Sequence, residues 1–248
     1  MPDFLPDLPV EGIVECLKRS PGHEFRTGKM DGPESSAALV ANAFGWFLNR
    51  ADQMPALQGV PSGQVTSLTL EAEMRYPWKE GRHPWLDVGM ESATTLIGIE
   101  SRRYEPFRPS KNVGFSEIYD RPVWREKLPK FTQLRDDLVA GKVGFEALDA
   151  VQLVKSAYGI WTRAEKRASG AVLVYLYADP VNWASGKKVD ANRKALHRRE
   201  LAEFSNLIAG DGVTFVRLRW SDLLAQWAAV PVLAAHAAGL REMFPDLG

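Results

Sequence analysis

A run of seven apolar residues at positions 171–177 (Ala-Val-Leu-Val-Tyr-Leu-Tyr) limits the architecture of this chain more than any other segment. A run without alternation of apolar and polar residues is typical of a strand buried on both faces in the middle of a sheet. A sheet with such a strand needs helices on both of its sides. Residues 131–140 and 145–167 show helical spacing of apolar residues, so we expect them to cover the sheet.

The remaining segments complete an α/β pattern. We expect helices over 35–52 and 193–208, strands over 67–76, 84–90, 95–103 and 212–219, and a last helix with Ser221 as its N-cap. The strand over 67–76 alternates strictly and should place on one face Leu68, Leu70, Ala72, Met74 and Tyr76. This order predicts one α/β domain with a mixed α+β sheet over 34–248, after a proline-rich N-terminal arm over 1–33.

Charge and cysteine content narrow the class of protein. The chain has 31 Lys and Arg against 31 Asp and Glu, which argues against a nucleic-acid binder that relies on overall positive charge. The single Cys16 excludes an intramolecular disulfide and a cysteine-based zinc site, and it favours a reducing compartment. The acidic, proline-rich start is unlike a signal peptide, and we find no segment that could span a bilayer. We therefore expect a cytoplasmic protein without a membrane partner.

Two acidic residues are expected to meet in a hairpin between the second and third strands. If the turn falls on residues 93 and 94, Val88 faces Ile99 and Asp87 faces Glu100. Like charges at opposed positions destabilise a sheet unless something compensates them, and a divalent cation would do so. The period of two puts Arg102 on the same face as Glu100. The opposite, apolar layer should receive Leu86, Val88, Ile97 and Ile99.

The expected ligand set points to a hard metal ion. Asp and Glu oxygens, without cysteine or paired histidines, favour Mg²⁺ or Mn²⁺ over zinc. Such an ion can polarise a phosphodiester and activate a water molecule, while a nearby cation assists phosphoryl transfer. Asp87, Glu100 and Arg102 therefore indicate phosphodiester hydrolysis. The alternative is that these residues form the ordinary exposed face of a strand.

The hairpin with Asp87 and Glu100-Ser-Arg102, the helix before it, the later helix and the buried run at 171–177 resemble the PD-(D/E)XK nuclease superfamily. The segment from Gly98 to Phe107 looks like that of a bacterial branch of restriction-endonuclease-like proteins. The resemblance covers about residues 33–220. It implies a restriction-endonuclease-like α-β-β-β-α-β core with flanking helices and a Mg²⁺-dependent endonuclease that acts on DNA.

The resemblance also implies roles for single residues. Asp87 and Glu100 would hold the metal, and Glu34, on the first helix, would be an accessory acid. The lysine of the family motif falls at Arg102, and arginine effectively never loses its proton, so Arg102 suits electrostatic stabilisation and not general-base chemistry. A migrated lysine is one way to restore a base. Lys155, close to Gln152 on the later helix, is the candidate, and a solvated helix position is the alternative reading.

A basic stretch follows the buried run. Residues 187–199 contain six Lys and Arg against one Asp, and the predicted contacts to a phosphate backbone are Lys187, Lys188, Arg193, Lys194 and Arg198. A solvated helix face is the alternative. Glu71 and Glu73 are expected to face solvent, or one of them to be a further metal ligand.

Three functions remain open from the sequence. The first is a Mg²⁺-dependent deoxyribonuclease acting through Asp87 and Glu100, and a homodimer is expected if it cuts both strands of a duplex. The second is a nuclease-fold protein that binds nucleic acid or a protein partner without cleavage, which the arginine at position 102 favours. The third is a metal-free structural or assembly protein, for which the zero net charge is mild support.

Overall fold

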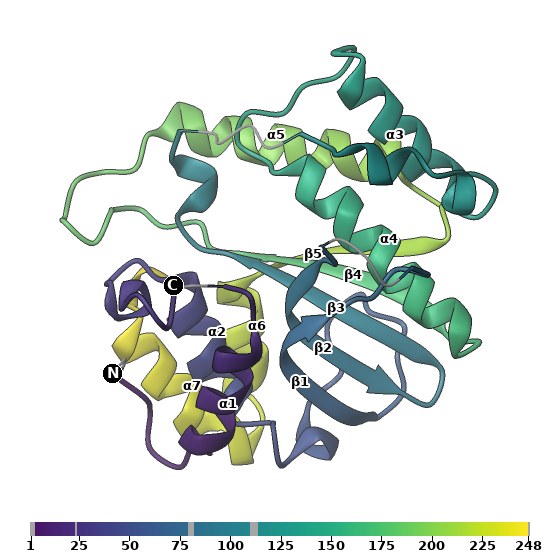
Figure 1. Cartoon of the computed structure of the whole chain (residues 1–248). Coiled ribbons are helices and arrows are strands. Elements are labelled where there is room, and N and C mark those ends of the chain that lie inside the picture. Colours follow the sequence, from purple (N-terminus) through teal and green to yellow (C-terminus); the bar gives the residue numbers. More distant parts are fainter. Residues whose placement is uncertain (1–2, 23, 79–81, 110–113, 248) are drawn as a thin grey trace.

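The fold is built on one five-stranded sheet (Figure 1). The computed structural model describes residues 3–22, 24–78, 82–109 and 114–247. The strands are β1 (Val65–Glu73), β2 (Trp85–Ser92), β3 (Thr95–Arg102), β4 (Gly170–Tyr177) and β5 (Val213–Arg219). They lie in the sheet in the order in which they occur in the chain. β1, β2 and β3 pair antiparallel, whereas β3, β4 and β5 pair parallel, so the predicted mixed sheet is confirmed.

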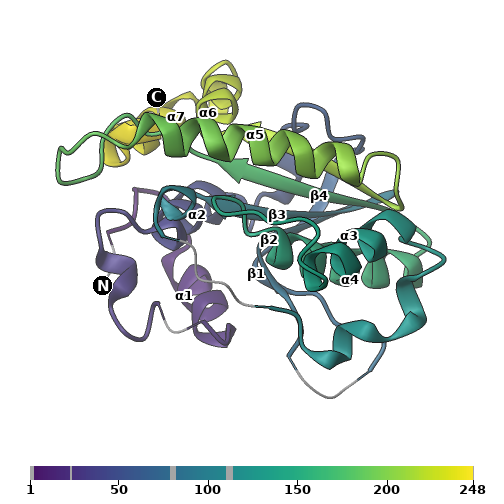
Figure 2. The same cartoon turned by 90° about the horizontal axis from the view of Figure 1, so that it is seen from above.

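Helices cover both faces of the sheet, as the apolar run in β4 predicts (Figures 1 and 2). The described residues form seven α-helices, which are α1 (Val10–Arg19), α2 (Ser36–Gly45), α3 (Pro129–Val139), α4 (Ala150–Lys166), α5 (Ala191–Leu207), α6 (Trp220–Ala228) and α7 (Pro231–Met243). α1, α2, α6 and α7 lie on one face, and α3, α4 and α5 lie on the other. The result is a three-layer α/β protein.

β4 supplies both apolar cores. Val172, Val174 and Leu176 point into the core shared with α1, α2, α6 and α7, which we call the first core. Leu173 and Tyr175 point into the core shared with α3, α4 and α5, the second core. The strand is thus buried on both faces, as predicted from its composition. The segment before residue 34 belongs to the first core as well, through residues such as Ile13 of α1.

Two helices are shorter than the sequence predicts. The helix expected over 35–52 is α2, which ends at Gly45 and is followed by turns. The Ser35 side chain accepts a hydrogen bond from the Ala38 N–H, so Ser35 is the N-cap and Glu34 lies outside the helix. The helix expected over 145–167 begins only at Ala150, because Asp149 caps it by accepting from the N–H of Gln152.

The prediction of one last helix with Ser221 as its N-cap is wrong. Two helices follow β5, and the chain enters α6 directly from the strand, with Arg219 at the N-cap position. Pro231 starts α7, because proline fits the first turn of a helix but cannot continue an existing one. The break lies at Val230, whose backbone is extended.

The predicted single face of the first strand is also wrong. Leu68 and Leu70 belong to the first core, but Ala72 and Met74 belong to the second. The change occurs at Glu71, whose backbone has a φ of 50°, in the left-handed region that few residues other than glycine adopt. The paired strand β2 shows the same change of face, since Leu86 lies in the second core while Val88 lies in the first.

No helix in the described part of the chain has both the length and the apolar character needed to cross a bilayer.

Candidate functional site

The two carboxylates predicted to face each other lie at one end of the β2–β3 hairpin. The hairpin pairs Val88 with Ile99, which confirms the predicted register. One position further along each strand are Asp87 and Glu100. Asp87 Oδ2 accepts a 2.6 Å hydrogen bond from the backbone N–H of Ser101. The Asp87 side chain therefore ties β2 to β3 next to Glu100, beyond the last backbone pair of the hairpin.

Arg102 contacts Glu100 and lies on the same side of β3, as predicted. Its Nη2 donates to Glu100 Oε1 at 2.5 Å, and its Nη1 donates to the backbone carbonyl of Ser101 at 2.9 Å. The guanidinium thus spans two oxygens of its own strand. The Arg102 side chain keeps 20% of its surface exposed against 6% for Glu100, so the arginine is the more outward of the two.

The second oxygen of Glu100 is the unusual atom of this cluster. Glu100 Oε2 is buried and has no hydrogen-bond partner among the described residues. A buried carboxylate oxygen without a partner is costly, because it has lost its contact with water and gained nothing in return. Such an oxygen suits a proton or a cation.

Burial dominates the titration of both acids. It raises the pKa of Asp87 and of Glu100 above the usual range, and the positive charge of Arg102 opposes the shift without cancelling it. The negative charge of Asp87 raises the pKa of Glu100 further. Two buried acids with raised pKa values beside one arginine are typical of a functional site.

Glu71 of β1 is a third acid next to this pair. Its Oε2 accepts a 2.6 Å hydrogen bond from the Ser20 hydroxyl, just after α1. Burial, and then the charge of Asp87, raise the pKa of Glu71 to about 7. Backbone strain of the kind seen at Glu71 is concentrated at functional sites in proteins. Glu73, the other acid predicted on this strand, instead pairs with Arg75 at 2.8 Å.

Glu105 is an acid of the site that the sequence did not indicate. It accepts hydrogen bonds from the Ser36 hydroxyl at 2.6 Å and from the backbone N–H of Arg103 at 2.7 Å. Burial alone would raise the pKa of Glu105, but the charge of Arg102 and these donors lower it. The strand periodicity that located Glu100 and Arg102 ends with β3, so no pattern in the sequence extends to Glu105.

Glu34 lies before α2, so the prediction that places it on the first helix is wrong. Its Oε2 accepts from Arg108 at 2.7 Å, and its Oε1 accepts from the backbone N–H of Ala184 at 3.1 Å. Ser35 takes the N-cap position. The Glu34 carboxylate is thus engaged by a loop after β3 and a loop after β4.

Lys155 and Gln152 lie on α4, as predicted, but their contacts are elsewhere. Lys155 Nζ donates to the Gly114 carbonyl at 3.1 Å and sits 5.2 Å from the ring centre of Tyr119. Burial lowers the pKa of Lys155. Gln152 Nε2 lies 3.4 Å from the Ser156 hydroxyl. Among the described residues, no hydrogen bond or ion pair joins either side chain to Asp87 or Glu100.

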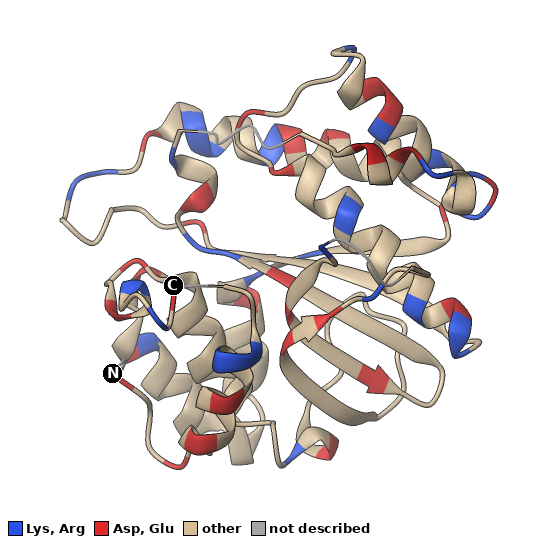
Figure 3. Ribbon diagram, in the orientation of Figure 1, with Lys and Arg blue, Asp and Glu red and all other residues tan. Residues whose placement is uncertain are grey.

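The basic stretch is divided between structural and exposed positions. Arg193 donates to the carbonyls of Pro106 and Arg108, both at 3.0 Å. Lys194 and Arg198 both pair with Asp179, at 2.9 and 3.0 Å. Acidic positions accompany the basic ones in this part of the molecule (Figure 3). The remaining two, Lys187 and Lys188, are exposed in the loop between β4 and α5.

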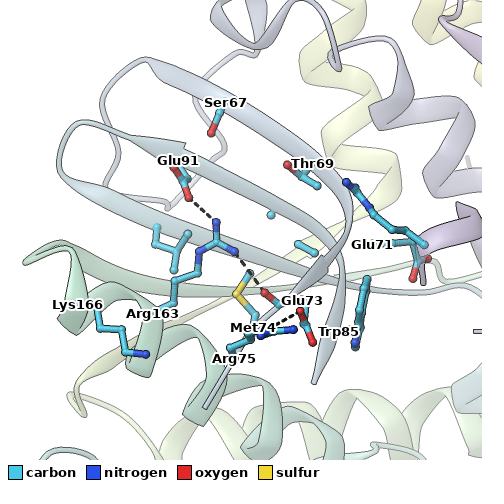
Figure 4. Close-up of a pocket in the computed structure, with 14 residues that line it drawn as sticks. Ser67, Thr69, Glu71, Glu73, Met74, Arg75, Trp85, Glu91, Arg163 and Lys166 are labelled. Carbon is cyan, nitrogen blue, oxygen red and sulfur yellow. Dashed lines mark hydrogen bonds and ion pairs between the residues drawn. The ribbon is translucent and has the colours of Figure 1, made fainter. Parts of the chain in front are cut away.

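A hollow of about 560 Å³ opens along β1 (Figure 4). Glu71 lines it, whereas Asp87, Glu100 and Arg102 are not among its lining residues. Further along, Glu91 pairs with Arg163 at 2.8 Å. The hollow therefore holds charges of both signs, and most of them are already paired.

Within the described ranges, no three or more His, Cys, Asp and Glu side chains are grouped so that they could hold a metal ion. No family model matches the chain, and no curated protein or solved structure matches it either.

Proposed function

We propose that the protein is a metal-dependent phosphodiesterase that hydrolyses DNA, with Mg²⁺ or Mn²⁺ bound by Asp87 and Glu100. The observation that carries the proposal is the buried Glu100, which lies beside Asp87 and has one oxygen without a hydrogen-bond partner among the described residues. Two buried carboxylates destabilise a fold unless protons or cations compensate them, and Arg102 supplies one positive charge for the two acids.

The residues present fit such an ion. Mg²⁺ is commonly bound by one or two carboxylates and completes its octahedral shell with water. When bound, the ion would polarise the phosphodiester and lower the pKa of a water molecule. The Ser101 N–H fixes the orientation of Asp87, and Arg102 stabilises the negative charge that develops on the phosphorus centre. Because arginine keeps its proton, Arg102 is not the general base.

The order of elements supports the same proposal. α2, β1, β2, β3, α4 and β4 occur in this order along the chain, as helix, three strands, helix and strand, with α3 as an additional helix between β3 and α4. This is the α-β-β-β-α-β order that the resemblance to the PD-(D/E)XK superfamily implies, and we propose a restriction-endonuclease-like topology on that ground. Contact with the phosphate backbone is assigned to Lys187 and Lys188, whose side chains are exposed.

The test joins metal binding to cleavage. Titration calorimetry with Mg²⁺ and Mn²⁺ and a plasmid-nicking assay are run on the wild type, on Asp87→Asn and on Glu100→Gln. We expect metal binding and nicking in the wild type, and loss of both by at least about a hundredfold in the two variants. Asp222→Asn, which removes an exposed carboxylate paired with Arg219, is the matched control and should cut as the wild type does. Nicking that persists unchanged in Asp87→Asn would refute the proposal.

A second function is favoured by the arginine itself. Because Arg102 already compensates Glu100 and cannot act as a base, the fold could bind nucleic acid or a protein partner without cutting it. This function predicts a mobility shift of DNA with the wild-type protein and no nicking with any divalent ion. Lys187→Gln with Lys188→Gln should then weaken the shift, and the weakening should depend on salt concentration.

A further inference from the structure

We propose that the Arg102 guanidinium is an internal counter-ion that occupies the place of the divalent cation, so that the cation binds only when Arg102 moves away. This inference concerns the regulation of the site described above and rests on the proposed function for its biological meaning. It is argued from the contacts of three residues of β3.

The first step is the geometry of the guanidinium. Arg102 reaches two oxygens at once, Glu100 Oε1 at 2.5 Å and the Ser101 carbonyl at 2.9 Å. Both are hard oxygen donors of the kind that Mg²⁺ and Mn²⁺ prefer. Asp87 is held against the same residue, Ser101, through its N–H. The arginine therefore already occupies donors that a cation between Asp87 and Glu100 would use.

The second step is charge. With Asp87 and Glu100 ionised, the cluster carries two negative charges and Arg102 one positive charge. A divalent ion and a guanidinium that share one carboxylate repel each other strongly in a site with little water. With Arg102 in place, Glu100 Oε2 has no hydrogen-bond partner in the part of the chain that the structure describes. One arginine thus leaves part of the site uncompensated, which a divalent ion would complete.

The Arg102 guanidinium also needs a second place to bind when it leaves Glu100. The Arg102 side chain retains 20% exposure, so it lies at the outer side of the cluster. Glu105 is close enough that the charge of Arg102 lowers its pKa, and its carboxylate is fixed by Ser36 and the Arg103 N–H. Glu105 or the phosphate of a substrate can therefore receive the guanidinium when it leaves Glu100.

The experiment measures Mn²⁺ affinity, which does not depend on turnover. The dissociation constant is determined by calorimetry and by electron paramagnetic resonance of free Mn²⁺ for the wild type, Arg102→Gln and Arg102→Lys. We expect Arg102→Gln to bind Mn²⁺ about tenfold tighter or more, because a unit charge has been removed next to the ion. Arg102→Lys keeps the charge but loses the fork that spans two oxygens, so it should bind severalfold tighter.

Two further variants separate this effect from a general change in charge. Arg219→Gln removes an arginine that pairs with Asp222 and is half exposed, and it should bind Mn²⁺ as the wild type does. The double variant with Arg102→Gln and Glu100→Gln should not show the tighter Mn²⁺ binding, because the Glu100 carboxylate that would bind the ion has been removed. Should Arg102→Gln fold only when Mn²⁺ is added, as followed by circular dichroism, that result also supports the counter-ion.

The inference is overturned if neither Arg102→Gln nor Arg102→Lys binds Mn²⁺ more tightly than the wild type, or if the gain survives the loss of Glu100. Its failure is distinct from failure of the proposed function. Nicking by the wild type without a gain in Arg102→Gln refutes the counter-ion alone. A gain in Arg102→Gln with an inert wild type supports the counter-ion and refutes the nuclease activity.

Discussion

His197 lies on α5 with its imidazole against Tyr175, the neighbour of Glu100 on β4. The Tyr175 hydroxyl and His197 Nε2 are 2.9 Å apart, and both side chains belong to the buried interior. Burial lowers the pKa of His197 from 6.5 to about 4, so the folded protein holds this ring neutral over a range in which the unfolded chain protonates it.

The sign of the resulting pH dependence follows from this difference. Above pH 6.5 the His197 ring is neutral in both the folded and the unfolded state, so its burial does not lower the stability. As the pH falls from 6.5 toward 4, the free energy of unfolding decreases, because only the unfolded state then binds the proton. We expect the free energy of unfolding of the wild type to fall by up to about 3 kcal/mol more than that of His197→Gln between pH 7 and pH 4. Urea unfolding at several pH values measures this difference. Parallel curves for the two proteins would contradict the prediction.

Also at the residue scale, positions in the candidate site could be predicted where the alternation of a strand determines which side chains share a face. The two-residue turn and the alternation of β3 located Asp87, Glu100 and Arg102 relative to one another. Glu105 was not predicted because it lies beyond β3, in a segment without periodicity. The sequence predicts Glu71 to face solvent or to be a further metal ligand, but its left-handed backbone was not predicted, because no local pattern encodes it.

At the scale of elements, the sequence predicted existence and type well and boundaries poorly. The apolar run of β4 and the alternation in the hairpin were strong signals, because burial on one or two faces leaves a direct trace in composition. Helix ends depend on single caps. Ser35, Asp149 and Pro231 each moved a boundary away from the one suggested by apolar spacing alone.

The contact between α4 and β3 gives a prediction at this scale. Gly98 lies two positions before Glu100, and a Cβ on it would come within 2.3 Å of Leu86 Cδ1 and 2.7 Å of Ile160 Cδ1. In Gly98→Ala the Leu86 and Ile160 side chains must shift within a packed core, so we expect the substitution to lower the free energy of unfolding by about 1–3 kcal/mol.

Thermal or urea unfolding measures this cost. Gly63→Ala is the matched control, because a Cβ there meets nothing within 4 Å, and it should leave stability within about 0.5 kcal/mol of the wild type. Equal stability of Gly98→Ala and Gly63→Ala would show that the sheet and α4 adjust to each other more freely than the packing of this interior implies.

At the scale of the whole molecule, the segment after α7 is tied to the strand that carries the site. Arg103, the residue after Arg102, is 3% exposed and donates from Nε to Asp246 at 2.9 Å and from Nη1 to the Pro33 carbonyl at 2.8 Å. Asp246 itself forms an ion pair with Arg103 and is also largely buried. One side chain therefore joins β3, the segment before α2 and the segment after α7.

Removing one partner of this pair should be costly. Asp246→Ala leaves a buried guanidinium without its counter-charge, and we expect it to lower the free energy of unfolding by about 3 kcal/mol. Asp222→Ala, which breaks the exposed pair with Arg219, is the control and should cost less than about 1 kcal/mol. Denaturant unfolding compares the two, and similar costs would show that the Arg103 pair is no stronger than one at the surface.

The Arg103–Asp246 pair also sets an order of events during synthesis. The two residues are 143 positions apart, so β3 leaves the ribosome long before the partner of its terminal arginine exists. Until then, the end of the strand next to Asp87 and Glu100 carries an arginine whose burial has no counter-charge. Contacts between distant parts of a chain form late and make folding slow. The candidate site is therefore completed only after residue 246 has been synthesised, and a nascent chain that stalls before residue 246 should lack it.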